Sequence, residues 1–306
     1  MLTDSPRLRA NLLLLLTAVI WGFAFVAQRS GMEFVGPFAF NAIRFFIGGL
    51  MLAPLMIVLD RRRAAARLPV VALGNRTVVV GGALAGLVLF AAATLQQMGI
   101  AFTTAGKAGF ITSLYVVLVP IMGLALGHRP SMPVWAGALL AVAGLYFLTI
   151  EGGFRMAWGD LLVLFGAFLW AGHVLLIGRL SPATDPVKLA FAQFMACAAI
   201  SAIAALLTET TSIADLRAAL LPILYAGIMS VGVGYTLQVI AQGHTRPADA
   251  AILLSLEAVF AVIGGWLLLG EQLSLRAFFG CALMLAGILI SQLVGRPEDA
   301  AAEISH

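Results

Sequence analysis

The chain has 306 residues, of which 62% are hydrophobic and only 10% are charged, with a mean hydropathy of +1.05. So little polar surface cannot cover a water-soluble globule, which excludes soluble folds and predicts an all-α integral membrane protein. The net charge of +4 does not indicate nucleic acid as a partner, because no basic stripe is interleaved with aromatic residues.

Apolar runs of helix length, separated by Pro, Gly and charged breaks, predict ten transmembrane helices. A hydrocarbon core of about 30 Å needs about 20 helical residues. The first run is expected to be a mature helix and not a signal peptide, because it continues past Trp21 without a small-residue cleavage site. The expected spans are 11–28, 37–59, 77–100, 104–127, 132–150, 158–178, 186–207, 219–242, 247–269 and 274–294.

The distribution of Lys and Arg predicts the orientation, since cytoplasmic loops carry the excess of these residues. If both termini are cytoplasmic, twelve cations lie inside, five lie outside and Arg44 lies within a helix. We therefore expect a bacterial inner-membrane protein with cytoplasmic termini. The twelve are Arg7, Arg9, Arg61, Arg62, Arg63, Arg67, Arg76, Arg129, Arg179, Lys188, Arg246 and Arg296, and the five are Arg29, Lys107, Arg155, Arg217 and Arg276.

The second half of the chain repeats the first. An offset of 149 residues pairs Trp21 with Trp170, an offset of 142 pairs Gln96 with Gln238, and an offset of 143 pairs Gly127 with Gly270. The repeats are expected at 1–150 and 151–306. Because each holds an odd number of helices, they are expected to be inverted, with a central cavity between them.

The motifs at matched places resemble a known group. They are Trp21-Gly22-Phe23-Ala24-Phe25, Arg44-Phe45, Lys107-Ala108-Gly109-Phe110-Ile111-Thr112-Ser113-Leu114-Tyr115, Leu254-Ser255-Leu256-Glu257-Ala258-Val259-Phe260 and Gly270-Glu271-Gln272-Leu273. They are similar to the drug/metabolite transporter superfamily, and within it to the EamA-type permeases.

The resemblance implies ten helices, two inverted five-helix repeats and a central substrate cavity, with amino-acid exporters of the YddG type as functional relatives. The chain departs from the pattern at Ala258, where the family often has Pro, and at Gly127-His128, where the Gly-Glu corner is not repeated. Both departures leave the substrate open.

Polar residues at mid-span usually face a partner, a cavity or water. Helical spacing places Tyr235, Gln238 and Gln242 on one face, and Thr17, Trp21, Ala24 and Gln28 on another. We expect these faces to converge on one cleft without metal or cofactor. The candidate substrate-binding residues are Trp21, Gln96, Lys107, Tyr115, Trp170, His173, Tyr235, Gln238 and Glu257.

Each candidate also has a structural interpretation. The glutamines can join helices by hydrogen bonds, the tryptophans can belong to an interfacial belt, and His173 can be a core residue. Arg44 and Lys107 can reach the interface by snorkelling. Glu257, which aligns with Tyr115, is too deep for that and must be paired, protonated or facing water.

These features predict a carrier that exports small amphipathic metabolites, amino acids first, by alternating access. The alternatives within transport are phosphorylated sugars, which need several mid-membrane cations, and drugs or quaternary amines. A membrane enzyme needs a reactive cluster that the four His residues do not form, so no enzyme is expected. A non-transport membrane protein needs neither repeats nor buried polar faces.

Overall fold

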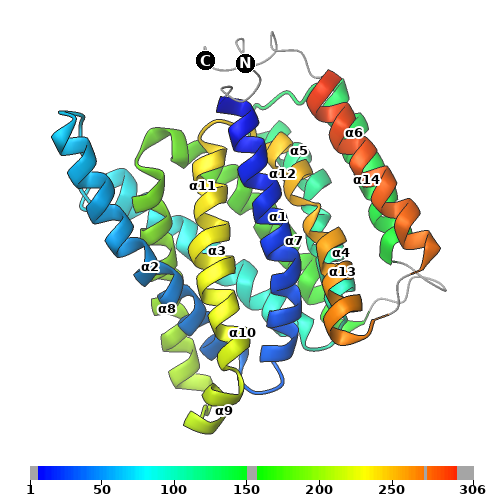
Figure 1. Cartoon of the computed structure of the whole chain (residues 1–306), viewed down its shortest axis with the longest axis horizontal. Helices are drawn as coiled ribbons and strands as arrows, with labels where there is room; N and C mark the ends of the chain where they lie inside the picture. Colours follow the sequence, from blue (N-terminus) through cyan, green and yellow to red (C-terminus); the bar gives the residue numbers. More distant parts are fainter. Residues whose placement is uncertain (1–5, 150–156, 272–273, 295–306) are drawn as a thin grey trace.

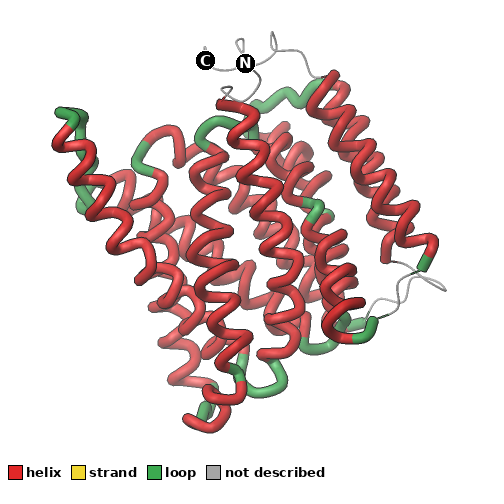
Figure 2. Tube along the Cα trace, in the orientation of Figure 1, coloured by secondary structure: helices red, strands yellow, loops and turns green. Residues whose placement is uncertain are grey.

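The structure is a computed structural model that describes residues 6–149, 157–271 and 274–294. In this part the chain forms a bundle of helices without β-strands (Figures 1 and 2). The helices are α1 Pro6–Gly31, α2 Pro37–Ala65, α3 Arg76–Ile100, α4 Ala105–Ser113, α5 Tyr115–Ala125, α6 Met132–Thr149, α7 Trp158–Leu180, η1 Ser181–Ala183, α8 Pro186–Thr208, α9 Ile213–Ala218, α10 Leu220–Leu224, η2 Tyr225–Tyr235, α11 Thr236–Gln242, α12 Pro247–Leu254, α13 Glu257–Leu269 and α14 Leu275–Val294.

Eight helical segments of the described part are long and apolar enough to cross a membrane. The apolar stretches of α6 and α14, at Met132–Phe147 and Phe278–Ser291, are shorter. These two helices lie side by side at one edge of the bundle (Figure 1), in contact through Gly137 and Gly287. The membrane-helix character is confirmed, and the number ten stays a prediction.

Two of the expected helices are interrupted at matched positions. One breaks between α4 and α5 at Leu114, and the other breaks between α12 and α13 at Leu256, 142 residues later. Gly127 and Gly270, after the ends of α5 and α13, both adopt the left-handed conformation, with φ of +84° and +69°. Both of these glycines were paired from sequence alone, and their shared conformation agrees with the pairing.

The equivalent broken helices run in opposite directions. Glu271, which follows α13, accepts hydrogen bonds from the backbone nitrogens of Ala105 and Gly106 at the start of α4, at 3.1 and 3.4 Å. The end of α13 therefore lies at the start of α4. We call the end of the bundle at which α1 begins the N-terminal end, and the opposite end, at which α4 and α7 begin, the distal end (Figure 1).

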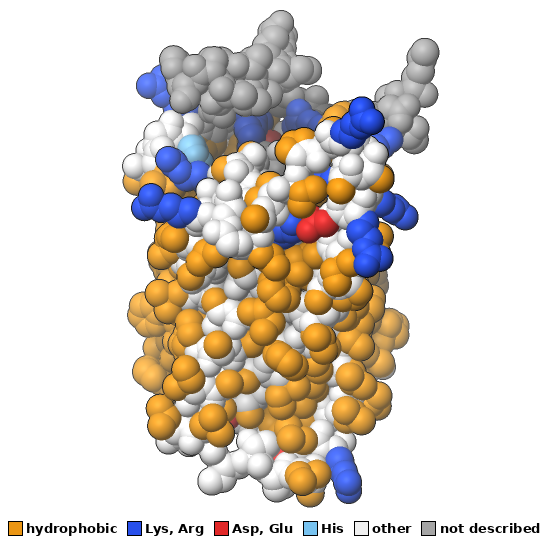
Figure 3. All heavy atoms as spheres, turned by 90° about the vertical axis from the view of Figure 1, so that its left-hand side faces the viewer, with side chains coloured by type: hydrophobic (Ala, Val, Ile, Leu, Met, Phe, Trp, Pro, Cys, Tyr) orange, Lys and Arg blue, Asp and Glu red, His pale blue; other side chains and the backbone are white. Residues whose placement is uncertain are grey.

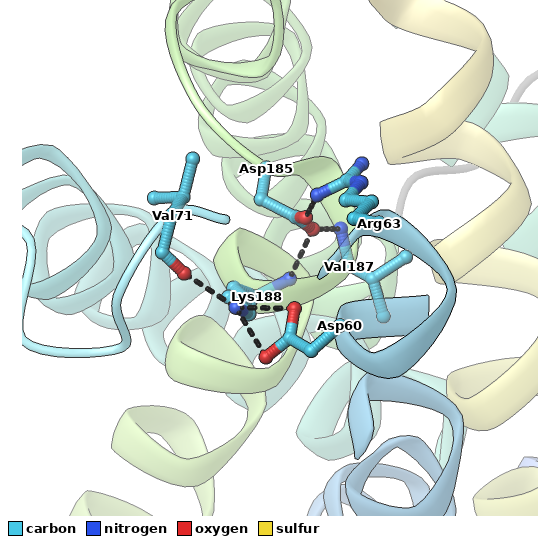
Figure 4. Close-up of polar contacts among 6 residues, drawn as sticks. All are labelled: Asp60, Arg63, Val71, Asp185, Val187 and Lys188. Atoms are coloured by element: carbon cyan, nitrogen blue, oxygen red, sulfur yellow. Dashed lines mark hydrogen bonds and ion pairs between the residues drawn. The ribbon is translucent and has the colours of Figure 1, made fainter. Parts of the chain in front are cut away.

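Carboxylates join α2 to α8 at both ends through hydrogen bonds and ion pairs, and we call each of these two sets of contacts a clasp. At the N-terminal end, Lys188 donates to both oxygens of Asp60 at 2.7 Å and to the carbonyl of Val71, while Asp185 binds Arg63 and the start of α8 (Figure 4). At the distal end, Glu209 accepts from the backbone nitrogens of Phe38 and Ala39 at 2.9 and 2.8 Å, capping α2. Asp60 and Glu209 stand 149 residues apart, so the two clasps occupy matched positions.

The surface matches a bilayer environment. Figure 3 shows hydrophobic side chains over the middle of one face and Lys and Arg side chains near the N-terminal end. Large apolar side chains are widely exposed, among them Leu206 at 86% and Phe165 at 61%. Lipid can cover such residues, whereas water would disfavour so large an apolar surface.

Candidate functional site

A small cavity lies in the middle of the bundle, between the two halves of the chain. Its volume is about 30 Å³, room for a water molecule or two. Seven of the nine predicted site residues line it, contributed by α1, α3, α5, α7, η2, α11 and α13: Trp21, Gln96, Tyr115, Trp170, Tyr235, Gln238 and Glu257.

Glutamine side chains form a chain of hydrogen bonds along one side of the cavity. The indole nitrogen of Trp170 donates to Gln96 Oε1 at 2.8 Å, and Gln96 Nε2 donates to Gln28 Oε1 at 3.0 Å. Thr112 also donates to Gln96 Oε1, at 3.4 Å. Gln28 and Thr112 line the cavity but are absent from the predicted set, although Gln28 shares the face of Trp21 that spacing had marked.

Gln238 differs from its matched residue Gln96. Its carbonyl oxygen has no hydrogen-bond partner among the described residues, although Gln238 is only 1% exposed. A buried acceptor without a donor is costly, so the position favours a ligand or water that donates a hydrogen bond.

Aromatic rings form a wall of the cavity, with Tyr235 at their centre. Its ring centroid lies 4.4 Å from that of Trp21 and 5.9 Å from that of Trp170. Phe45 and Phe194 lie behind it, each at 6.0 Å. Such a wall presents several π faces to a solute and can bind either an apolar group or a cation.

The segment η2 that carries Tyr235 is a π-helix of 11 residues, a wider turn that is rare and often found at functional sites. Helix α1 holds it through three hydrogen bonds between side chains and backbone: Trp21 to Ser230 O at 3.1 Å, Thr17 to Gly234 O at 3.2 Å, and Tyr225 to Ile20 O at 3.0 Å. Gly234 permits this approach, since a Cβ there would lie 2.6 Å from Trp21 Nε1.

Glu257 is the first residue of α13, directly after the break at Leu256, and is 3% exposed. The hydroxyl of Ser113 lies 3.5 Å from its carboxylate, and Tyr115 lies beside it. Within residues 6–149, 157–271 and 274–294, no Lys or Arg forms an ion pair with Glu257. The cavity therefore holds an acidic group whose cation a ligand can supply.

Two predicted site residues lie elsewhere. His173 is fully buried behind the wall, where its Nε2 lies 2.9 Å from Gln193 Oε1 and its ring packs edge-on against Trp170. Lys107 lies at the distal end, where its ammonium binds Asp160 at 2.5 Å. His173 therefore packs in the core beside the cavity, and Lys107 forms an ion pair that joins the starts of two helices.

The expectation that Arg44 reaches the interface by snorkelling is wrong. Its side chain is 1% exposed, and its guanidinium lies over the rings of Phe45 and Phe40, at 4.9 and 5.5 Å. Because α2 packs this face against the rest of the bundle, the side chain has no route to the surface. Cation–π contacts stabilise the charge in place of water.

A second, larger cavity of about 730 Å³ opens at the N-terminal end, and we call it the vestibule. It lies between the ends of α5 and α7 and the starts of α1 and α12, and among its lining residues are Arg7, His128, Arg129, Gln242, Arg246 and Asp249. Gln242 donates to the carbonyl of Val174 at 2.9 Å, and Val174 lines the central cavity. This contact stands between the two cavities.

Comparisons with known proteins agree with this architecture. Residues 8–150 and 157–293 each match the EamA-like transporter family. A protein of Archaeoglobus fulgidus described as an uncharacterized transporter is 35% identical over 288 residues, which are 94% of this chain and 87% of that protein. The uncharacterized transporter YwfM of Bacillus subtilis is 30% identical over 97% of both chains. A solved crystal structure that is 23% identical has the same fold, with a TM-score of 0.71 over 94% of this chain and 97% of that one.

Proposed function

The chain belongs to the EamA-like transporter family, and from that premise we propose that it exports small amphipathic metabolites, amino acids first, by alternating access. The observation that carries the proposal is the central cavity, where the acidic side chain of Glu257, which pairs with no Lys or Arg of the described residues, lies among aromatic rings. Because the cavity holds only about 30 Å³, a solute can occupy it only after the surrounding helices separate.

The lining supports a solute that carries an amine. Glu257 offers an acidic side chain, Gln238 offers a carbonyl without a partner among the described residues, and the rings of Trp21, Trp170 and Tyr235 offer π faces and apolar area. An amino acid or another primary amine with an apolar side chain matches these groups. A quaternary amine is the second candidate, because the aromatic wall can bind a cation that donates no hydrogen bond.

The same lining disfavours phosphorylated sugars. Recognition of a phosphate group uses Arg or Lys in direct contact. The described residues that line the central cavity include neither, since Lys107 is bound to Asp160 and Arg44 lies over aromatic rings.

Alternating access is supported by the matched, oppositely directed helices. We propose two inverted repeats of five helices each, 1–150 and 151–306, with the binding cavity where they meet. We also place the N-terminal end in the cytoplasm of a bacterial cell, in line with the Lys and Arg side chains near that end (Figure 3). The vestibule is then the route by which a cytoplasmic solute enters.

Transport by the purified protein in proteoliposomes tests the function. We expect uptake or efflux of labelled apolar amino acids, and a loss of at least tenfold in Trp170→Ala and Gln238→Ala, with folding retained. Phe168→Ala is the matched control, since this aromatic residue of the same helix is 46% exposed. Equal rates in all three variants would remove the proposed site, whereas transport of tetraalkylammonium ions alone would select the second candidate.

The orientation has its own test. In a background without Cys197 and Cys281, a cysteine at Ala66 should resist an impermeant thiol reagent applied to intact cells, and one at Thr211 should react. Both positions are exposed and lie at opposite ends of the bundle. The reverse pattern would place the N-terminal end outside.

A further inference from the structure

An ion pair closes the distal end of the bundle between the two halves of the chain. Lys107, at the start of α4, binds Asp160, at the start of α7, at 2.5 Å. Asp160 is fully buried, and its same oxygen accepts from the backbone nitrogen of Ala157 at 2.7 Å. A buried carboxylate held by a cation from another helix resists the separation of those helices, because parting would leave the charge uncompensated.

The N-terminal end carries an ion pair at the corresponding place. The offset of 142 residues relates Lys107 to Asp249, and the offset of 149 relates Asp160 to Asn11. Asp249, at the start of α12, faces Arg7, one turn before Asn11 in α1, at 3.9 Å. Besides the Asp60–Lys188 and Arg63–Asp185 pairs between α2 and α8, each end therefore has, among the described residues, one charge pair at these matched places that joins the first half of the chain to the second.

The two pairs are in different states. The distal pair is in direct contact, whereas 3.9 Å is too long for a hydrogen bond between Arg7 and Asp249. Asp249 binds Arg246 of its own loop at 2.9 Å instead, and both Arg7 and Asp249 line the vestibule. The open space therefore lies beside the stretched pair.

A second contact at the distal end is not repeated at the other end within the part of the chain that the structure describes. Glu271 joins α13 to the start of α4 through the nitrogens of Ala105 and Gly106. The matched residue, 143 positions earlier, is His128. Its Nδ1 lies 3.1 Å from the place where a Cβ on Gly123 would stand, so His128 packs on α5, the helix before it. The departure from the Gly-Glu pattern thus coincides with the end that is open.

We propose that Lys107–Asp160 and Arg7–Asp249 are alternating latches of the two ends, the first closed and the second released in this conformation. The inference rests on the proposed alternating access. It assigns Lys107 a positioning role: opening the distal end breaks its bond to Asp160, and closing the vestibule brings Arg7 onto Asp249. The conformation described here is then open toward the N-terminal end.

Cysteine accessibility measured from each face tests the latches without any transported solute. The background lacks Cys197 and Cys281 and carries one cysteine at Ala24, in the central cavity, or at Ala248, in the vestibule. Right-side-out and inside-out vesicles receive an impermeant thiol reagent. We expect Lys107→Gln and Asp160→Asn to raise labelling at Ala24 from the distal face at least fivefold and to lower labelling at Ala248 from the other face.

Matched control variants distinguish the loss of the latch from a general loosening of the helix bundle. Asp160→Asn keeps an acceptor for Ala157, and Lys107→Arg keeps the charge and should label like the parent. Arg29→Gln removes a distal-end cation whose partner Glu33, four residues later, belongs to the same half of the chain, and it should change nothing. Labelling in Lys107→Gln and Asp160→Asn equal to that in Arg29→Gln would overturn the latches. Because labelling needs no substrate, it tests the latches even if the transport assay finds no transported solute.

Discussion

The indole nitrogen of Trp170 donates to Gln96 Oε1 at 2.8 Å, joining α7 of the second half of the chain to α3 of the first. Gln96 Nε2 in turn donates to Gln28 Oε1 in α1 at 3.0 Å. The side of the cavity is thus one connected set of groups from three helices, in which each amide orientation depends on the next.

Replacing Gln96 by Leu should destabilise this set. The substitution keeps the size of the side chain but leaves the Trp170 N–H and a Gln28 oxygen without partners, at a cost of about 1–3 kcal/mol. Thermal unfolding in detergent should show a lower Tm, and transport should fall with it. Met98→Leu, on the exposed side of the same helix, is the control. If Gln96→Leu and Trp170→Phe were strictly additive in the double variant, the two residues would not be coupled.

Gly234→Ala should displace Trp21. A Cβ at this position would lie 2.6 Å from the indole nitrogen, which then loses its bond to Ser230 O. Overpacking of this kind costs about 1–3 kcal/mol, and the change in the surroundings of Trp21 should alter its fluorescence. Gly172→Ala serves for comparison, because its Cβ would meet nothing nearer than Met122 Cε at 3.9 Å. Equal stability and transport in the two variants would refute the close packing of α1 on η2.

Glu257→Gln removes the charge and the titratable proton while it keeps the shape and most of the hydrogen bonding. The variant should fold, since Ser113 can still donate to the side-chain oxygen. We expect it to lose its preference for amine-bearing solutes or the pH dependence of transport between about pH 5.5 and 8.5, the interval that brackets neutrality for such assays. Glu33→Gln, on a side chain that is 61% exposed, should behave like the parent. An unchanged pH profile and an unchanged substrate preference would make Glu257 a structural residue.

Gly36→Ala should open the distal clasp between α2 and α8. A Cβ on Gly36 would fall on the carboxylate of Glu209, which caps α2 through Phe38 and Ala39. Loss of such a cap costs about 0.5–2 kcal/mol, measurable as a lower Tm. Gly74→Ala places a methyl group where no atom lies within 4 Å and should leave Tm unchanged. A Tm for Gly36→Ala that matches Gly74→Ala would show that the clasp contributes nothing.

Much of the architecture could be predicted from the sequence. Hydrophobic length identifies membrane helices, because a lipid core requires about 20 apolar residues for each span, and eight segments meet this requirement. Helical periodicity placed Trp21 and Gln28 on one face, and the offset of 142 residues marked Leu114 and Leu256 as equivalents before both proved to be helix breaks. These features depend on local chemistry and on register, which a sequence carries directly.

The tertiary structure alone decided which polar groups meet. Periodicity shows that Lys107 and Asp160 lie at the starts of their helices, but not that two helices 53 residues apart in the chain bring them together. It also could not show that the Arg44 guanidinium lies over the ring of Phe45, or that η2 is a π-helix whose Ser230 carbonyl accepts a hydrogen bond from Trp21. The physical reason is that helix faces are set by neighbours three and four residues away, whereas the partner of a face is chosen by packing across the whole bundle.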